Sequence, residues 1–163
     1  MTMVRSKTLI NKITIVREFT FEAAHWLPYY EGMAGDLHGH TYKLEIGLRG
    51  DVDLETGMVA DFSAIDEHIR ESILKHVQHT CLNNLEEVHN FPHEVPTLEN
   101  IVIWIVNRLI NDITRNKLDY IKRNVPANTS INLVLVRLWE TPQQYAEWTP
   151  RENNVNVNLR RLS

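Results

Sequence analysis

The amino-acid sequence predicts a single α+β domain. Periodic segments follow the order strand, strand, helix, helix, strand, strand, and this separation of strands from helices is typical of α+β folds rather than of parallel βαβ arrays. The chain has 163 residues, of which 43% are apolar and 23% charged, a composition that supports one hydrophobic core. We expect residues 1–149 to form one domain and residues 150–163 to form a C-terminal tail.

Two alternating segments open the domain. From Ile13 to His25, apolar and polar residues fall on opposite parities, which predicts a half-buried strand whose apolar face is interrupted by Arg17. From Leu37 to Gly50 the alternation is cleaner. Because the two strands are adjacent in sequence, we expect them to pair as an antiparallel hairpin.

Two helices are expected next. Ser63 and Asp66 resemble a capping box at the start of a helix that runs from about Ala64 to Val77, with isoleucines at four-residue spacing. An irregular stretch follows this helix. Thr97 is then a suitable N-cap for a second helix. The apolar stripe of that second helix consists of Ile101, Trp104, Ile105, Leu109 and Ile113.

The last periodic segments are strands. The segment Ser130–Glu140 is rich in Val, Leu and Ile, which favours a strand, and Thr141-Pro142 ends it. The segment Gln144–Trp148 is predicted to be a final strand. Glu140 shares its parity with Val134, Val136 and Leu138, so its side chain is expected on the inward face.

Composition excludes several classes of function. No apolar run approaches the ~20 residues that a membrane helix needs, so we expect no membrane partner. The first residues carry no apolar signal-peptide core, which predicts a cytoplasmic protein. The single cysteine, Cys81, excludes an internal disulfide framework. The net charge of −4 provides no general attraction to nucleic acid.

The eight histidines are the unusual feature of the composition. His38 and His40 lie two residues apart on a predicted strand and therefore share a face, and His25 ends the preceding strand. Three imidazoles could converge at one end of the hairpin, which is the ligand pattern of catalytic zinc. From spacing alone, a structural or surface role is about equally open. His68 and His76, on the first helix, are expected to face solvent.

Four short motifs, in this order, resemble the 6-pyruvoyl-tetrahydropterin synthase family. They are FEAAH at Phe21–His25, HGHTY at His38–Tyr42, PTLEN at Pro96–Asn100 and LWETP at Leu138–Pro142. The bacterial branch of this family is 6-carboxy-tetrahydropterin synthase, which acts in queuosine biosynthesis. The resemblance implies the tunnelling fold (T-fold), with four antiparallel strands and two helices on one face of the sheet. It also implies a homo-oligomer, a trimer or a hexamer of two trimers, whose sheets close a barrel and whose active sites lie at subunit interfaces.

The resemblance also implies a site. Zn²⁺ would be held by His25, His38 and His40. The substrate would be a small-molecule pterin, 7,8-dihydroneopterin triphosphate, whose side-chain hydroxyls the zinc would polarise. Glu140 would hold the amino and ring N–H groups of the pterin. Thr97 falls in the segment that lines the family's pterin pocket.

Two of the family's catalytic positions differ in this chain. Ala34 stands at the position of the family's cysteine and has no titratable group. Gln78 replaces the aspartate of an Asp–His pair whose histidine is His79. Glutamine cannot stabilise an imidazolium as a carboxylate does, although it can fix the ring by hydrogen bonding. His79 and Asp36 are therefore the catalytic candidates.

Three interpretations of these differences stay open. The alanine could be an introduced change that disables the enzyme. The chain could instead be a natural variant in which Asp36 or Glu31 supplies a base. Cys81 could also supply a thiol.

We expect a zinc-dependent lyase of the 6-pyruvoyl- or 6-carboxy-tetrahydropterin synthase type, which eliminates triphosphate from 7,8-dihydroneopterin triphosphate and rearranges or cleaves the side chain. The alternatives are aldolase-like cleavage to 6-hydroxymethyl-dihydropterin, a catalytically disabled pterin-binding protein, and a structural oligomer without a ligand.

Overall fold

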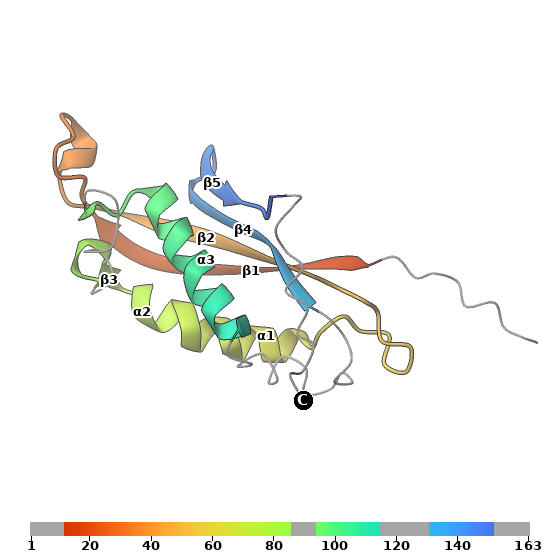
Figure 1. Cartoon of the computed structure of the whole chain (residues 1–163). Helices are drawn as coiled ribbons and strands as arrows, with labels where there is room; N and C mark the ends of the chain where they lie inside the picture. The colour runs from red at the N-terminus through yellow and green to blue at the C-terminus, as the bar shows by residue number, and fades with distance from the viewer. Residues whose placement is uncertain (1–11, 86–93, 115–130, 152–163) are drawn as a thin grey trace, which may run out of the picture.

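The computed structural model describes residues 12–85, 94–114 and 131–151 (Figure 1). Most of the predicted tail, residues 152–163, lies outside the described residues. The strands are β1 (Ile13–His25), β2 (His38–Gly50), β3 (Thr80–Cys81), β4 (Ile131–Thr141) and β5 (Gln144–Trp148). The helices are α1 (Phe62–Ile69), α2 (Lys75–Val77) and α3 (Leu98–Thr114). None of the helices in the described ranges is long and apolar enough to cross a membrane.

The strands form one sheet in the order β3-β1-β2-β4-β5. The predicted hairpin is confirmed, because β1 and β2 pair antiparallel from Ile13 opposite Gly50 to His25 opposite His38. The expectation of four antiparallel strands is wrong for the described residues, where β3 adds a fifth strand parallel to β1. A strand of two residues is too short to show alternation, so the sequence pattern gave no sign of it.

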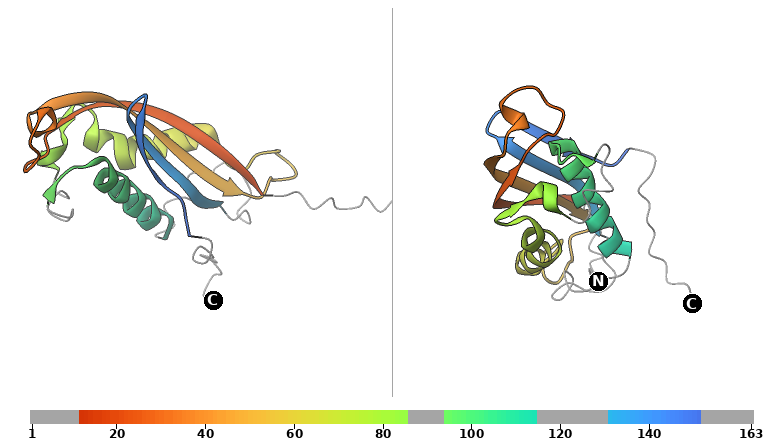
Figure 2. Two further views of the ribbon diagram at one scale, coloured as in Figure 1. Left: turned by 90° about the horizontal axis from the view of Figure 1, so that it is seen from above. Right: turned by 90° about the vertical axis from the view of Figure 1, so that its left-hand side faces the viewer.

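The helices lie against one face of the sheet, as expected (Figure 2). The core is formed where that face meets the helices, and β2 contributes Tyr42, Leu44 and Ile46 to it, each at most 2% exposed. Burial of such side chains stabilises the fold by roughly 1.5–3 kcal/mol each. The core therefore fixes which parity of β1 and β2 faces inward.

The first helix begins at Phe62, two residues earlier than predicted. Asp61 is its N-cap, and its carboxylate accepts the Ser63 N–H at 2.8 Å. The predicted capping box at Ser63 and Asp66 is wrong, because the Asp66 carboxylate accepts two hydrogen bonds from Arg17, at 2.6 and 2.7 Å. This ion pair also explains why a charged residue interrupts the apolar face of β1. A π-helical segment, Arg70–Leu74, joins α1 to α2.

The second predicted helix, α3, begins as expected. The Thr97 hydroxyl accepts the Asn100 N–H at 3.3 Å, which satisfies one of the free donors of the first turn. The helix also buries Asp112, whose Oδ2 lies 3.4 Å from His68 Nε2 of α1. The expectation that His68 faces solvent is therefore wrong, since it is only 8% exposed.

A β-bulge in the pairing of β2 with β4 determines which face of the sheet the end of β4 presents to the core. Gly47 lies opposite Leu135 and Leu48 opposite Leu133, which leaves Val134 as an extra residue. A Cβ atom on Gly47 would lie 2.7 Å from the Leu135 Cβ, so this close approach requires glycine. Beyond the bulge, the inward parity of β4 continues to Glu140, which contacts β1 and β2 side chains of the core face.

Candidate metal and substrate site

Three histidines meet at one end of the β1–β2 hairpin. His25 and His38 are cross-strand partners, and His40 lies two residues further along β2 on the same face. One ring nitrogen of each histidine lies within 4.8 Å of the other two. His25 is 2% exposed, whereas His38 and His40 are half-buried. The expected convergence of the three rings is thus confirmed, while their role as metal ligands stays a prediction.

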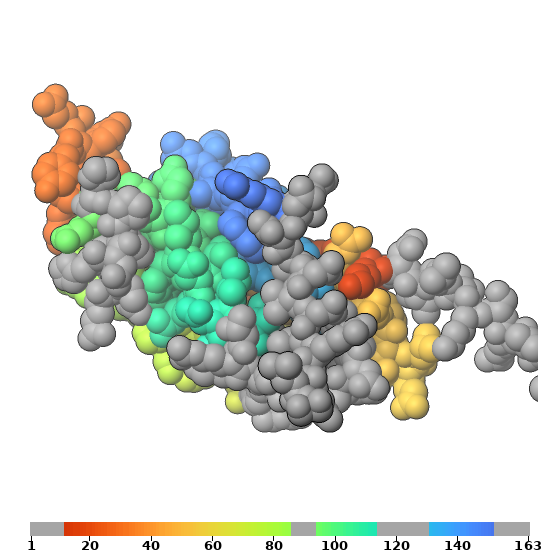
Figure 3. Space-filling model, in the orientation of Figure 1, coloured from red at the N-terminus to blue at the C-terminus, as the bar shows by residue number. Residues whose placement is uncertain are grey.

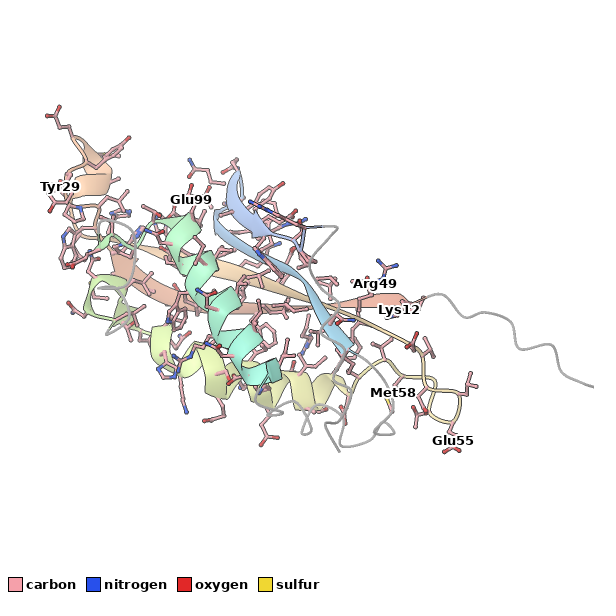
Figure 4. All side chains as sticks on the ribbon, in the orientation of Figure 1. Lys12, Tyr29, Arg49, Glu55, Met58 and Glu99 are labelled. Carbon is pink, nitrogen blue, oxygen red and sulfur yellow. The ribbon has the colours of Figure 1, made fainter. Side chains whose placement is uncertain are left out.

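The histidines lie beside the loop that joins β1 to β2. This loop projects from one end of the molecule (Figure 3). Tyr29 lies on this loop, and Lys12 and Arg49 lie at the opposite end of the hairpin (Figure 4). The site therefore lies at the loop end of the sheet, where loop residues and the start of α3 can reach it.

Backbone carbonyls fix the orientation of two of the rings. Pro96 O accepts a hydrogen bond from His25 Nδ1 at 2.9 Å, and Asp36 O accepts one from His38 Nδ1 at 2.8 Å. A carbonyl can only accept, so in the neutral rings the proton is on Nδ1 and the lone pair is on Nε2. This outer hydrogen bond is the arrangement that metal-bound histidines use.

The inward-facing nitrogens fit a cation. The Nε2 atoms of His25 and His40 are buried and have no hydrogen-bond partner among the described residues. Leaving buried polar atoms unsatisfied costs about 1–3 kcal/mol each. Neutral imidazole nitrogens are preferred ligands of Zn²⁺, and three of them leave a fourth position open. The residues present therefore fit the metal that the family motifs imply.

Glu140 brings a negative charge to this group. Its Oε1 atom lies 3.3 Å from His25 Nε2 and 3.7 Å from His40 Nε2, and the Tyr42 hydroxyl donates to it at 3.5 Å. The His25 ring holds the pKa of Glu140 below its usual value, and His40 and His38 act in the same direction. Glu140 is therefore ionised at neutral pH.

Two neighbours of Glu140, Tyr42 and His40, have pKa values shifted towards their neutral forms. Burial is the main cause that raises the pKa of Tyr42 well above its ordinary value, so its hydroxyl keeps its proton. Burial also lowers the pKa of His40, with smaller contributions from His25 and His38, although Glu140 opposes the shift. A cation bound between the histidine nitrogens and the Glu140 carboxylate would be stabilised by the negative charge of Glu140.

A cleft of about 500 Å³ opens beside His40. It runs along the edge of the sheet, where β3 pairs with the end of β1. His79 and Cys81 line it together with His40, so the structure brings one catalytic candidate and the only cysteine next to a candidate metal ligand. The remaining lining residues are Glu22, Ala23, Ala24, Leu37, Gly39, Thr41 and Thr80.

Other predicted site residues lie outside the lining of this cleft. The Asp36 side chain is exposed, and the contact of this residue with the site is made by its backbone carbonyl, which binds His38. Thr97 caps α3 and directly follows Pro96, which binds His25, so it lies on the α3 side of the histidines. Tyr42 and Pro96 are contacts of the site that no sequence pattern indicated, although Tyr42 shares the parity of His40.

The fold and the site together define the class of this protein as an α+β domain with a candidate three-histidine metal centre. Residues 14–151 match the family model described as 6-pyruvoyl tetrahydropterin synthase, and the chain therefore belongs to this family. The T-fold that the motifs imply is confirmed by solved structures. That of Caenorhabditis elegans 6-pyruvoyl tetrahydropterin synthase has a TM-score of 0.67 and 25% identity, covering 87% of this chain and 98% of the other.

Curated relatives in the family carry two different activities in their names. The 6-carboxy-5,6,7,8-tetrahydropterin synthase of Haemophilus influenzae is 29% identical over 152 residues, which cover 82% of this chain and 96% of the relative. The dihydroneopterin monophosphate aldolase of Pyrococcus furiosus is 30% identical over 129 residues, covering 79% of this chain and 90% of the relative. Family membership therefore indicates a tetrahydropterin synthase-type enzyme and leaves the reaction to the details of the site.

Proposed function

We propose that the chain is a zinc-dependent lyase that eliminates triphosphate from 7,8-dihydroneopterin triphosphate. The observation that carries this proposal is the convergence of three histidine nitrogens, two of them buried without a hydrogen-bond partner among the described residues, next to an ionised glutamate. His25, His38 and His40 would hold the zinc, which would act as a Lewis acid on the hydroxyls of the substrate side chain.

Glu140 is proposed to bind the pterin ring. Its carboxylate is ionised and can accept two parallel hydrogen bonds from an amino group and a ring N–H, which are charge-assisted and therefore strong. The Tyr42 hydroxyl supports the orientation of the carboxylate from inside the core. Thr97, on the α3 side of the histidines, is proposed as a further contact to the ring.

His79 and Asp36 are proposed to handle protons of the substrate side chain. The role of His79 is supported by the cleft, which both His79 and His40 line. Asp36 holds His38 through its carbonyl, which leaves its exposed carboxylate available. Ala34 supplies no proton acceptor.

Aldolase-like cleavage of the side chain is the second candidate reaction. Two observations favour it: a relative named dihydroneopterin monophosphate aldolase is 30% identical, and alanine stands where the motifs imply a cysteine base. The same metal and pterin contacts would serve both reactions, since the reactions differ in which bond of the side chain breaks. The product, rather than the binding site, distinguishes them.

The test is a product assay. The zinc-loaded chain is incubated with 7,8-dihydroneopterin triphosphate, and the pterin and phosphate products are identified by mass spectrometry. Release of triphosphate together with a 6-pyruvoyl- or a 6-carboxy-tetrahydropterin supports the lyase, whereas 6-hydroxymethyl-dihydropterin supports the aldolase. Binding of the pterin without any product, in protein that contains stoichiometric zinc, would overturn both reactions and favour a pterin-binding protein.

We also propose that the chain assembles into a trimer or a hexamer of two trimers. Within the described ranges, β3 covers only Ala23 and Ala24 of β1, which leaves most of the outer edge of β1 without a strand partner. β5 forms the other edge of the sheet. Pairing of these edges between copies would close the sheet into a barrel and remove both edges. Light scattering coupled to size-exclusion chromatography gives the mass, and a monomer at all concentrations would contradict this assembly.

A further inference from the structure

Gln78 connects His79 to the backbone of β1 through both ends of its amide group. Its Oε1 atom accepts the Glu22 N–H at 3.4 Å, and its Nε2 atom lies 2.9 Å from His79 Nε2. A backbone N–H can only donate, so the oxygen of the amide must face Glu22. The NH₂ group of Gln78 therefore faces the imidazole ring, and an NH₂ group can only donate.

From this arrangement we infer that Gln78 is a positioning residue that holds neutral His79 with its proton on Nδ1. The ring nitrogen Nε2 accepts from Gln78, so its lone pair is occupied. Among the described residues, Nδ1 of His79 has no hydrogen-bond partner, and His79 lines the cleft beside His40. His79 therefore offers a ligand an N–H donor and not a free lone pair.

The backbone around His79 is built to keep the ring in place. His79 has a φ of 57°, in the left-handed region that residues other than glycine rarely adopt. Its N–H donates to Glu22 O at 2.7 Å, and the next residue, Thr80, pairs with Ala23 in the sheet and donates its hydroxyl to Val77 O at 2.9 Å. Bonds on both sides of His79 therefore determine a conformation that would otherwise be disfavoured.

The polarity of this pair is the reverse of that of an Asp–His pair. A carboxylate can only accept, so it selects the tautomer with the proton on the facing nitrogen and leaves the other nitrogen as a base. Gln78 donates instead, so the facing nitrogen is the acceptor and the far nitrogen carries the proton. The chain thus lacks both a thiol at Ala34 and a carboxylate-supported base at His79, and both changes remove a proton acceptor from the site.

The consequence for the substrate rests on the proposed function. A donor at Nδ1 of His79 fits an oxygen atom of the substrate, such as a hydroxyl or a developing carbonyl of the pterin side chain, and it would stabilise negative charge that develops there. Removal of a proton from carbon would then fall to another group. His79 is in this view a hydrogen-bond donor to the substrate, and Gln78 is the residue that makes it one.

The tautomer can be measured directly in the full chain without any substrate. Histidine is labelled with ¹⁵N, and long-range ¹H–¹⁵N spectra are recorded above pH 8, well above the ordinary pKa of histidine side chains in general. The His79 signals are assigned by their loss in His79→Gln. We expect the Nδ1-protonated form in excess, by up to about tenfold for one hydrogen bond. Excess of the Nε2-protonated form would overturn the inference.

The isosteric variant Gln78→Glu supplies the second arm of the test. A glutamate keeps an oxygen for the Glu22 N–H and presents an acceptor to His79, so the proton should move to Nε2 and the tautomer excess should reverse. An unchanged tautomer in this variant would refute the role of Gln78. Signals of His25 and His38, whose rings are fixed by backbone carbonyls, should stay in place and serve as the control for folding. Because no substrate is used, failure of the product assay leaves this result intact.

Discussion

Replacement of His38 by alanine should sharply weaken zinc binding without disrupting the core. His25 is unsuitable for this experiment, since it is 2% exposed and bonded to Pro96, so its loss would disturb the packing of α3 against the sheet. His38 is half-buried, and its outer hydrogen bond reaches only two residues back, to Asp36. Loss of a ligand there removes a metal contact and little else.

The magnitude follows from the number of ligands. Structural zinc sites with four ligands bind with about 10–16 kcal/mol, or roughly 3 kcal/mol for each ligand. Loss of one ligand should therefore raise the zinc Kd by about 100-fold, because 1.4 kcal/mol is a factor of ten. Competition with a chromophoric chelator measures this Kd in both proteins.

Thermal unfolding gives an independent measurement of the same quantity. At a zinc concentration about 1,000 times the parent Kd, binding stabilises the folded state by about 4 kcal/mol, and only by about 1.4 kcal/mol if the Kd is 100-fold weaker. For a chain of 163 residues, 1 kcal/mol corresponds to about 2–4 °C in Tm. We expect zinc to raise the Tm by about 8–16 °C in the parent and by about 3–6 °C in His38→Ala.

The control for this experiment is His79→Ala. His79 is exposed and lies outside the group of three converging nitrogens, so this variant should keep the full zinc-induced increase in Tm. Equal increases in the parent and in His38→Ala would refute the assignment of the metal site. A loss of the zinc-induced increase in Tm in both His79→Ala and His38→Ala would also contradict this assignment.

Three further predictions test the site and the fold. Ala34→Cys should increase turnover of 7,8-dihydroneopterin triphosphate in a discontinuous product assay, whereas unchanged turnover would favour rewired chemistry. Arg17→Met should lower the free energy of unfolding at pH 7. Because Arg17 lowers the pKa of Asp66, the difference from the parent should disappear as acid protonates this carboxylate. A difference in the free energy of unfolding that is the same in urea titrations at pH 7 and at acid pH would contradict this prediction. Gly47→Ala should destabilise by about 1–3 kcal/mol through its contact with Leu135, and an unchanged urea midpoint would argue against that contact.

Much of the metal site could be predicted from sequence because strand geometry is local. Side chains alternate with a period of two, so the spacing of His38 and His40 determines that they share a face. The antiparallel hairpin then brings His25 opposite His38, as the register shows. The inward direction of Glu140 also followed from parity, although the bulge at Val134 shifts the parity of the earlier part of β4.

Other features depended on contacts between residues far apart in the chain. Asp66 looked like a helix cap, but a long-range ion pair with Arg17 engages its carboxylate. His68 looked solvated on its helix until α3 placed Asp112 against it. The bonds from Gln78 to both Glu22 and His79 join the end of α2 to β1, and no periodic pattern indicates which way an amide group points.

The sequence by itself determined the alternation of β1 and β2, the start of α3 at Thr97 and the set of three histidines, because backbone periodicity and capping act over a few residues. Only the tertiary structure decided that buried Nε2 atoms face Glu140, that His79 shares a cleft with His40, and that Gln78 donates to His79. Burial and hydrogen-bond direction depend on which groups packing brings together, and such groups can be far apart in the chain. Glu22 and Gln78 are 56 residues apart, and Tyr42 and Glu140 are 98 residues apart.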